Sequence, residues 1–356
     1  MSPTERTHAD WTLQPYRPGD EHGILAMFNE EFGRQRSLAH WTWKFGRNPY
    51  GGPFITLARR RSDDAIVGNH VLMPVKLNVL GRPVLAGHSL DLVVRRPYWG
   101  QGIFESAGRD CIERFRQAGG AAVFAFPNAS SYPGFVRSLG WERIAYPVLR
   151  RRPLDLGRAL EQRGVPRLAA RLAGAPSRFA ARWRLARERR TGGRLRLSTG
   201  SEVPEGYDAL WDACRSQEVV SLWKDREYLD WRYVANPDTT FLFHAVADGS
   251  VMLGLAVTAE RDGVCWLCEL IVRERDAEVG RALLWQVERA ALDRRARAIQ
   301  FLGHDAGFFG EVLADYARRV AFANVFVAHG LEADDVSRRI AHPTNWTLSY
   351  GDADFV

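Results

Sequence analysis

Hydrophobic and polar positions along the first 150 residues predict alternating strands and helices. Short apolar runs rich in β-branched and aromatic residues alternate with longer segments whose apolar positions recur at helical spacing. The expected strands are residues 11–17, 54–60, 65–74, 84–94, 121–126 and 142–150. The expected helices are residues 22–32, 37–45, 104–118 and 131–139. We therefore expect a layered α/β fold (α+β, with a mixed sheet) around a central helix.

A second set of similar patterns follows residue 200. Residues 43–49 and 231–237 share the pattern W-(K/R)-(F/Y)-x-x-N-P, at an offset of 188 residues. A helix-like stretch precedes each copy and two strand-like runs follow it. This order predicts an internal repeat, with domains at residues 1–150 and 199–356. The W-K-F element itself is interpreted as a structural anchor at a helix end.

Between Arg150 and Arg196 the composition changes. The segment holds 15 Arg and only three acidic residues, whereas the whole chain has a net charge of +7. Proline and glycine interrupt apolar positions that fit short amphipathic helices. We interpret residues 151–198 as an Arg-rich helical connector with a solvated outer face. An anionic partner at this connector (RNA, acidic lipid or a phosphate-bearing substrate) is a less favoured alternative.

The composition excludes several classes of protein. Hydrophobic residues make up 46% of the chain and aromatic residues 11%, which excludes a disordered protein. Four cysteines in 356 residues do not make a disulfide framework and suit a reducing compartment. No apolar run approaches the roughly 20 residues that span a bilayer. We therefore expect a soluble, cytoplasmic protein with no membrane span.

The junction at residues 89–104 carries the candidate chemistry. A strand enters, Gly100 and Gly102 allow a tight turn, and a helix begins. Free N–H groups at a helix start, together with the helix dipole, form an anion site. Glycines let a phosphate group approach the backbone closely. The sequence lacks both the G-K-(S/T) of a P-loop and the third glycine of a dinucleotide fingerprint.

The junction resembles the signature (Q/R)-x-x-G-x-(G/A) of the GNAT superfamily of acyl-CoA-dependent N-acyltransferases. Residues 99–104 read W-G-Q-G-I-F, in which Gly102 matches the central glycine. Trp99 and Phe104 depart from the first and last positions of the signature.

Two downstream segments extend this resemblance. Residues 126–128 read F-P-N, and residues 139–141 read L-G-W, as the family has after its next strand and after the short helix that follows. The resemblance therefore covers residues 11–150 in order.

The resemblance implies acetyl-CoA or another acyl-CoA as cosubstrate. The backbone of residues 92–94 would pair with pantetheine, the N–H groups of residues 100–104 would hold the pyrophosphate, and Asn128 would bond the pantetheine arm or thiol region. The residues assigned to acyl-CoA are Leu92, Val93, Val94, Trp99, Gly100, Gln101, Gly102, Ile103, Phe104 and Asn128.

The resemblance also implies where the catalytic groups lie. The amine attacks as a neutral nucleophile, so a base or a water relay must take its proton. The family often places an acid on the fourth strand, where this chain has Asp91, with His88 and Ser89 nearby as relays. Many members reprotonate the leaving thiolate with a Tyr at the position that Val136 occupies here. Tyr132, four residues earlier, is the candidate substitute; otherwise the thiolate leaves without a dedicated acid.

The second half lacks the glycine turn. After the strand at residues 265–272 comes an acidic turn with one glycine, a poor pyrophosphate site. We interpret residues 199–356 as a degenerate GNAT-like domain that builds the substrate cleft or supports the first domain. Cys265 and Cys268 lack a second pair and would point to opposite faces of a strand, so no metal is expected. The acidic residues 351–354 are expected to be exposed.

These observations favour an N-acyltransferase that moves an acyl group, most simply acetyl, from acyl-CoA to a primary amine of a small molecule or amino sugar. A Fem-type transferase that uses an aminoacyl-tRNA or another large donor is one alternative. A non-catalytic GNAT-fold module that binds acyl-CoA or a partner is another. A monomer is expected, because a tandem repeat can supply within one chain the contact that single-domain relatives make as dimers. The acceptor and the acyl chain length stay open.

Overall fold

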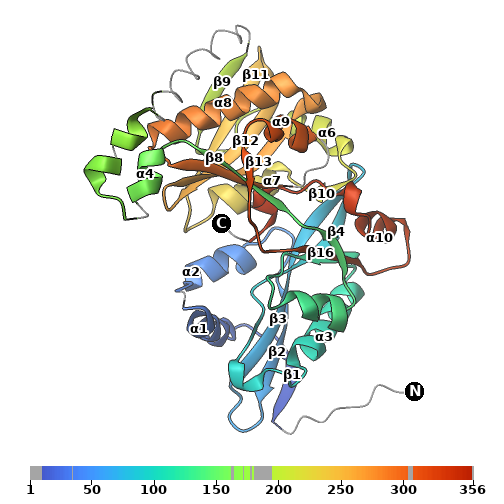
Figure 1. Cartoon of the computed structure of the whole chain (residues 1–356). Helices are drawn as coiled ribbons and strands as arrows, with labels where there is room; N and C mark the ends of the chain where they lie inside the picture. The colour runs from blue at the N-terminus through green and yellow to red at the C-terminus, as the bar shows by residue number, and fades with distance from the viewer. Residues whose placement is uncertain are drawn as a thin grey trace. The chain divides into compact units, whose positions relative to one another are not determined.

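The computed structural model describes residues 10–33, 35–161, 164–170, 172–176, 179, 195–303 and 308–354. The chain divides into two compact units (Figure 1). Unit 1 comprises Met1–Ala145 and Asn324–Pro343, and unit 2 comprises Tyr146–Ala323 and Thr344–Val356. Each unit is built on a mixed sheet with helices packed against it, which confirms the predicted fold class.

Unit 1 contains the elements predicted for the first half and one strand from near the end of the chain. Its strands are β1 (Trp11–Pro15), β2 (Phe54–Arg60), β3 (Ile66–Val79), β4 (Arg82–Ser89), β5 (Val93–Val94), β6 (Ala122–Ala125), β7 (Glu142–Ala145) and β16 (Phe326–Gly330). Its helical elements are α1 (Glu21–Phe32), α2 (Leu38–Trp41), η1 (Thr42–Gly46), η2 (Arg96–Tyr98), α3 (Ile103–Gln117), η3 (Gly134–Ser138) and α10 (Asp335–Ile340). The strand order is β1-β2-β3-β4-β6-β16-β7, and β5 pairs with β3.

Helix α3 packs on this sheet through the apolar face that its sequence pattern predicts. Phe115 is fully buried and meets Phe54 edge-on, with ring centroids 5.1 Å apart. Burying one such side chain stabilises the fold by about 2–3 kcal/mol. Gly108 brings the helix close to its neighbours, because a Cβ there would lie 2.9 Å from Leu139.

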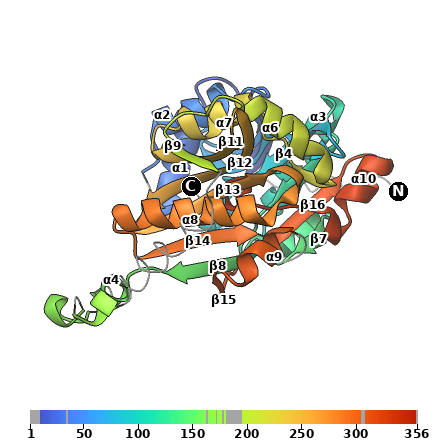
Figure 2. The ribbon, with the colours of Figure 1, turned by 90° about the horizontal axis from the view of Figure 1, so that it is seen from above.

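Unit 2 repeats the arrangement of unit 1. Its strands are β8 (Val148–Pro153), β9 (Arg196–Gly200), β10 (Val220–Leu222), β11 (Phe241–Asp248), β12 (Val251–Arg261), β13 (Val264–Val272), β14 (Ala298–Gly303) and β15 (Arg318–Val320). Its helical elements are α4 (Leu156–Glu161), α6 (Tyr207–Cys214), η5 (Arg215–Gln217), α7 (Arg226–Leu229), η6 (Asp230–Val234), η7 (Arg273–Arg275), α8 (Ala277–Asp293), α9 (Phe308–Ala314), η8 (Pro343–Asn345) and η9 (Tyr350–Asp352). The sheet order is β15-β8-β14-β13-β12-β11-β9, with α8 across one face (Figure 2).

Each sheet contains one strand that the chain order would place in the other unit. β8 follows directly on unit 1 in the chain but lies between β14 and β15 of unit 2. β16 follows unit 2 but lies between β6 and β7 of unit 1. The sequence predicted contiguous domains and a single strand at residues 142–150. The structure instead breaks that strand at Tyr146-Pro147, where proline has no N–H for a ladder.

Two further expectations concern the connector and the C-terminal segment. Of the predicted helical connector, the structure describes α4 and parts of residues 164–179, and residues 180–194 lie outside the described residues. The expectation that residues 351–354 are exposed is wrong. Asp352 is 3% exposed and Ala353 is fully buried, because the acid pairs with a buried cation that the sequence pattern does not show.

Candidate functional site

The turn before α3 forms an open helix start. Gly100 and Gly102 have φ values of 75° and 82°, the left-handed region that glycine adopts without strain. Gly102 is the N-cap of α3 and has no side chain to occupy the first-turn N–H groups. Those N–H groups have no acceptor within the helix. The first-turn N–H groups of α3 are therefore left without a side-chain cap.

The strand before this turn separates from its neighbour. β4 pairs in parallel with β6 up to Ser89 and Ala125, and the register ends there. Beyond that point Val93 and Val94 pair only with β3, on the opposite side. The edge of residues 92–94 that faces away from β3 thus offers backbone groups to an extended ligand, apart from the Val94 carbonyl, which already accepts from the Trp99 indole N–H.

Asn69 holds this separated segment in place. Its side-chain oxygen accepts from the Val93 N–H at 2.9 Å, and its amide donates to the Asp91 carbonyl at 3.1 Å. Asp91 itself adopts a φ of 51°, an uncommon conformation for a residue with a Cβ. Asn69 carries no motif signal, so sequence reasoning missed it.

Two cations hold the Asp91 carboxylate. Lys44 Nζ donates to Oδ2 at 2.7 Å, and Arg36 forms an ion pair with Oδ1. Lys44 is only 1% exposed and belongs to the W-K-F element, so that element contributes a buried charge as well as aromatic anchors. Both oxygens of Asp91 are therefore engaged, and an amine could reach either only by displacing a cation or through a water.

The contacts of His88 and Ser89 differ from those expected of a simple proton relay. His88 is buried and stacks on Phe124, with ring centroids 4.5 Å apart and an interplanar angle of 18°. Ser89 Oγ instead lies 3.3 Å from Nε2 of His70. Burial lowers the pKa of His70 to about 3, so this ring is neutral near pH 7. The sequence did not single out His70, since a strand histidine has no distinctive spacing.

A backbone hydrogen bond joins Tyr132 to Asn128. The Asn128 side-chain oxygen accepts from the N–H groups of Ser130 and Ser131, at 3.0 and 3.1 Å, and so caps the turn that leads to η3. Tyr132 N–H donates to the Asn128 carbonyl, and its ring packs against the core beside Phe135. The structure thus brings these two predicted residues together. No hydrogen bond joins Tyr132 to Asp91 in the described chain.

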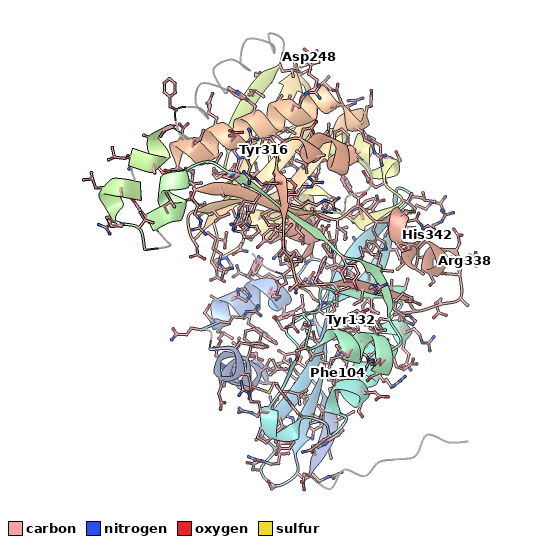
Figure 3. The ribbon with its side chains drawn as sticks, in the orientation of Figure 1. Phe104, Tyr132, Asp248, Tyr316, Arg338 and His342 are labelled. Atoms are coloured by element: carbon pink, nitrogen blue, oxygen red, sulfur yellow. The ribbon has the colours of Figure 1, made fainter. Side chains whose placement is uncertain are left out.

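The two positions that depart from the family signature have structural roles. Trp99 is 62% exposed, and its indole N–H donates to the Val94 carbonyl at 2.6 Å. Phe104 meets Phe135 edge-on at 5.4 Å, and Figure 3 labels it on α3 close to Tyr132. A Cβ on Gly134 would lie 2.7 Å from the Phe104 ring, so the glycine leaves the room that this large ring occupies.

The corresponding helix start in unit 2 is closed. Asp276 is the N-cap of α8, and its carboxylate accepts from the N–H groups of Glu278 and Val279. A fixed negative charge therefore occupies the place where a phosphate would bind. The preceding residues Glu274 and Arg275 both have positive φ. This geometry agrees with the interpretation that unit 2 lost its phosphate site.

Unit 2 nevertheless keeps an acid on the equivalent strand. Glu269 on β13 is 1% exposed and accepts from Lys224 Nζ and Tyr233 OH, each at 2.5 Å, and from Ser349 Oγ at 2.9 Å. Burial raises the pKa of Glu269, while the neighbouring ammonium of Lys224 opposes that rise. Lys224 also pairs with Asp352 at 2.7 Å.

The described residues contain neither a metal-binding cluster nor a membrane-spanning helix. No group of three or more His, Cys, Asp or Glu side chains is placed to hold a metal ion in this part of the chain. Among the same residues, no helix is long and apolar enough to cross a bilayer.

Comparison with known proteins finds one family model that matches part of unit 1. Residues 12–144 match the family model described as an acetyltransferase (GNAT) domain. No curated protein matches the sequence.

Solved structures extend the likeness to both units. A GCN5-related N-acetyltransferase from Kribbella flavida aligns at 17% identity and a TM-score of 0.61, over 91% of this chain and 72% of that one. A tandem GNAT protein from the clavulanic acid biosynthesis pathway aligns at 14% identity and 0.55, over 91% and 100%. Saccharomyces cerevisiae N-myristoyltransferase with bound myristoyl-CoA aligns at 10% identity and 0.59, over 94% and 88%. Residues 12–144 therefore resemble a GNAT acetyltransferase domain, and the two units together share the fold of a tandem GNAT protein.

Proposed function

We propose that unit 1 transfers an acyl group, most simply acetyl, from acyl-CoA to a primary amine of a small molecule or amino sugar. The observation that carries this proposal is the open start of α3 behind Gly102, beside a strand that separates from its neighbour after Ser89. The N–H groups of residues 100–104 would hold the pyrophosphate, and the backbone groups of residues 92–94 would pair with pantetheine, with the Val94 carbonyl released by Trp99 or left to it. The yeast enzyme with bound myristoyl-CoA supports an acyl-CoA as donor.

The reaction replaces the carbon–sulfur bond of the thioester with a carbon–nitrogen bond and removes one proton from the amine, and protonation of the thiolate restores the balance. The neutral amine nitrogen attacks the thioester carbon, the carbon–sulfur bond breaks, and sulfur leaves as a thiolate. The proton lost by the amine leaves through Asp91 or a water held by it. Because Arg36 and Lys44 already engage both carboxylate oxygens, the water route needs less rearrangement. Tyr132 is the proposed acid for the thiolate. His88, stacked on Phe124, would act only by shaping the site.

The proposal also covers the cellular compartment and the oligomeric state of the protein. Four buried free cysteines suit a reducing compartment, so we propose a cytoplasmic protein. We propose that it acts as a monomer. The acceptor binds as a free amine, and no metal takes part in the proposed steps.

Calorimetric titration with acetyl-CoA, desulfo-CoA and longer acyl-CoAs tests the donor. Gly102→Glu would place a side chain and a negative charge at the start of α3. Gly206→Glu is the matched control, because Gly206 is also a left-handed N-cap with φ 82° but belongs to α6 of unit 2. We expect about one site per chain, at least tenfold weaker binding in Gly102→Glu and unchanged binding in Gly206→Glu. If no CoA ester binds the wild type, the proposal fails and a tRNA-borne donor or a non-catalytic module takes its place.

A further inference from the structure

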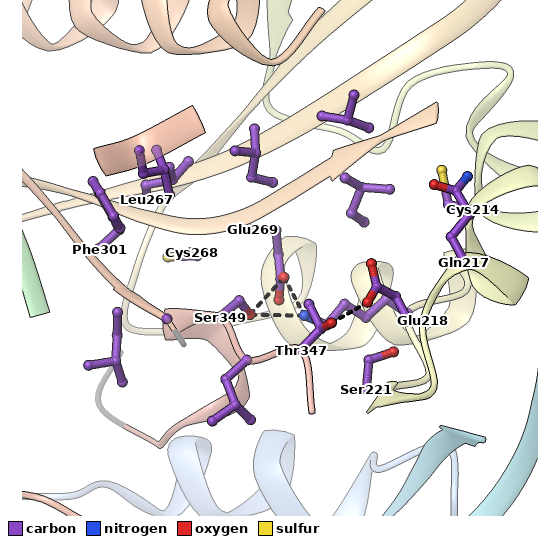
Figure 4. Close-up of a pocket in the computed structure, with 18 of the residues that line it drawn as sticks. Cys214, Gln217, Glu218, Ser221, Leu267, Cys268, Glu269, Phe301, Thr347 and Ser349 are labelled. Atoms are coloured by element: carbon purple, nitrogen blue, oxygen red, sulfur yellow. Dashed lines mark hydrogen bonds and ion pairs between the residues drawn. The ribbon is translucent and has the colours of Figure 1, made fainter. Parts of the chain in front are cut away.

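A pocket lies in unit 2 where two strands part. The parallel pairing of β13 with β14 ends at Leu267 and Phe301. Beyond these residues the pocket opens, with a volume of about 80 Å³ (Figure 4). All the residues that line it belong to unit 2. Neither the proposed transfer reaction nor the acyl-CoA site uses this pocket.

The strand edge inside the pocket offers unpaired backbone groups. Residues 269–272 pair with β12 on one side of β13. On the other side, no backbone hydrogen bond to β14 or to the C-terminal segment is found among the described residues. An extended ligand with its own amide or carbonyl could pair with this edge, as an added strand does.

The walls of the pocket are mainly apolar. Leu267, Phe301, Leu313 and Leu348 contribute aliphatic or aromatic side chains. The C-terminal segment forms one wall, and Thr347 and Ser349 attach it through hydrogen bonds to Glu218 and Glu269 (Figure 4). An apolar chain would therefore be favoured in the space between the strands.

The charged groups at the pocket are already compensated within the protein. Lys224 is engaged by Glu269 and Asp352, at 2.5 and 2.7 Å. Glu218 accepts from Thr347 and pairs with Arg275 at 3.3 Å. A charged ligand would have to break one of these buried contacts to find a partner. The lining thus favours a neutral ligand over an anion or an ammonium.

One buried donor in the lining has no partner. Trp211 lines the pocket, is 6% exposed, and its indole Nε1–H has no acceptor among the described residues. A buried donor without an acceptor costs about 1–3 kcal/mol, and a ligand oxygen would relieve that cost. Asp276 at the start of α8 excludes the phosphates of CoA from this unit. A ligand with an acceptor oxygen and no phosphate suits both features.

We propose that the unit 2 pocket binds a small neutral amide that carries a short apolar chain. Its carbonyl accepts from Trp211, its amide pairs with the open edge of β13, and its chain lies against Leu267 and Phe301. This site is separate from the acyl-CoA site and does not depend on the activity proposed for unit 1.

Titration of the full-length protein with three probes of similar size tests the ligand class. N-butylacetamide is the neutral amide, butylamine carries a positive charge at pH 7, and butyrate carries a negative one. We expect the amide to bind at least tenfold more tightly than either ion. Equal or tighter binding of butylamine or butyrate, or no binding of the amide, would overturn the proposal.

A pair of tryptophan variants tests the residue. Trp211→Phe removes the donor and keeps an aromatic ring, and we expect amide binding to weaken at least tenfold. Trp223→Phe is the matched control, because Trp223 meets Trp211 edge-on at 5.4 Å but does not line the pocket and donates to Asp225. Equal weakening in both variants would refute the assignment of Trp211.

Hydrogen exchange on the wild type keeps the proposal testable if Trp211→Phe does not fold. We expect N-butylacetamide to slow exchange of the backbone amides of residues 268–272 at least tenfold. Amides of β2 in unit 1 serve as the internal reference and should not change. No slowing at residues 268–272 would count against the site.

Discussion

Arg36 and Lys224 stand 188 residues apart and make the same kind of contact in the two units. Arg36 pairs with Asp91, in the segment that follows β4, and Lys224 pairs with Glu269 on β13, the equivalent strand. The offset equals that of the W-(K/R)-(F/Y) pattern. The repeat therefore includes a cation and an acid at the point where each sheet opens, although only unit 1 has the glycine turn before its helix.

Removing the acid of unit 1 should affect the reaction more than donor binding. We expect Asp91→Asn to lower kcat at least tenfold, because a proton route is worth about 10²–10⁴-fold in rate. Acetyl-CoA affinity should change less than threefold, since the proposed pyrophosphate site is at the start of α3. Steady-state kinetics on an amine substrate and calorimetry on the same samples separate the two effects. A kcat equal to that of the wild type would exclude Asp91 from the proton route.

Lys44 and Asp91 should be strongly coupled in stability. Asp91→Asn leaves the ammonium of Lys44, 1% exposed, without its carboxylate. Such a loss costs about 3–5 kcal/mol when a buried pair is broken. We expect the double variant Lys44→Met/Asp91→Asn to lose about 1–3 kcal/mol less than the sum of the single variants. Urea unfolding of the four proteins measures this coupling, and strict additivity would show that the two groups do not interact.

Lys224→Met should destabilise unit 2 in a pH-dependent way. Without the ammonium, Glu269 and Asp352 face each other as two buried carboxylates, at a cost of about 3–5 kcal/mol. Burial already raises the pKa of Glu269, and loss of Lys224 raises it further, so protonation relieves the repulsion as the pH falls. The deficit in unfolding free energy should therefore be smaller at pH 5.5 than at pH 8. Lys76→Met, which removes the lysine placed over the Tyr50 ring, is the control and should show little pH dependence.

His70 should make the protein sensitive to acid. Its pKa is lowered by burial to about 3 in the folded chain, below the ordinary histidine value of about 6.5. Between these values the unfolded chain binds a proton that the folded chain does not, so stability falls as the pH falls. The slope from this group is about 1.4 kcal/mol per pH unit. We expect His70→Asn to flatten unfolding free energy against pH between about 6 and 4. His244, whose pKa burial lowers to about 4, contributes separately and leaves a residual slope. An unchanged slope in His70→Asn would mean that His70 is protonated in the folded state.

The exchanged strand predicts which fragments fold. A fragment of residues 1–150 lacks β16 and leaves the edges of β6 and β7 unpaired, so we expect it to aggregate. The same fragment with residues 324–343 attached by a glycine-serine linker should give a monomer with a cooperative thermal transition. Size-exclusion chromatography and circular dichroism compare the two fragments. A monomeric, cooperatively unfolding 1–150 fragment would show that β16 is dispensable.

Local pattern was enough to predict most elements and the glycine turn before α3. Amphipathic spacing in α3, the apolar runs of β2, β3 and β6 and the glycines before α3 act over a few residues, and the structure has them where the sequence indicates. The strand predicted at residues 84–94 is instead broken between Ser89 and Val93, where Asp91 has a positive φ. The repeat of the W-(K/R)-(F/Y) element predicted two units of one fold. These features depend on hydrogen bonding and burial within one segment, which neighbouring residues largely determine.

The partners across the chain were decided only by the tertiary structure. The residues around Asp91 in the sequence do not indicate that it pairs with Lys44 and Arg36. Likewise, the residues around Glu269 do not indicate its contact with Lys224 or the pairing of Lys224 with Asp352. The exchange of β8 and β16 likewise depends on which sheet edge each strand reaches after a break at Pro147. A single residue type at one position does not encode its distant partner, because ion pairs and strand pairings form between segments that only the folded chain brings together.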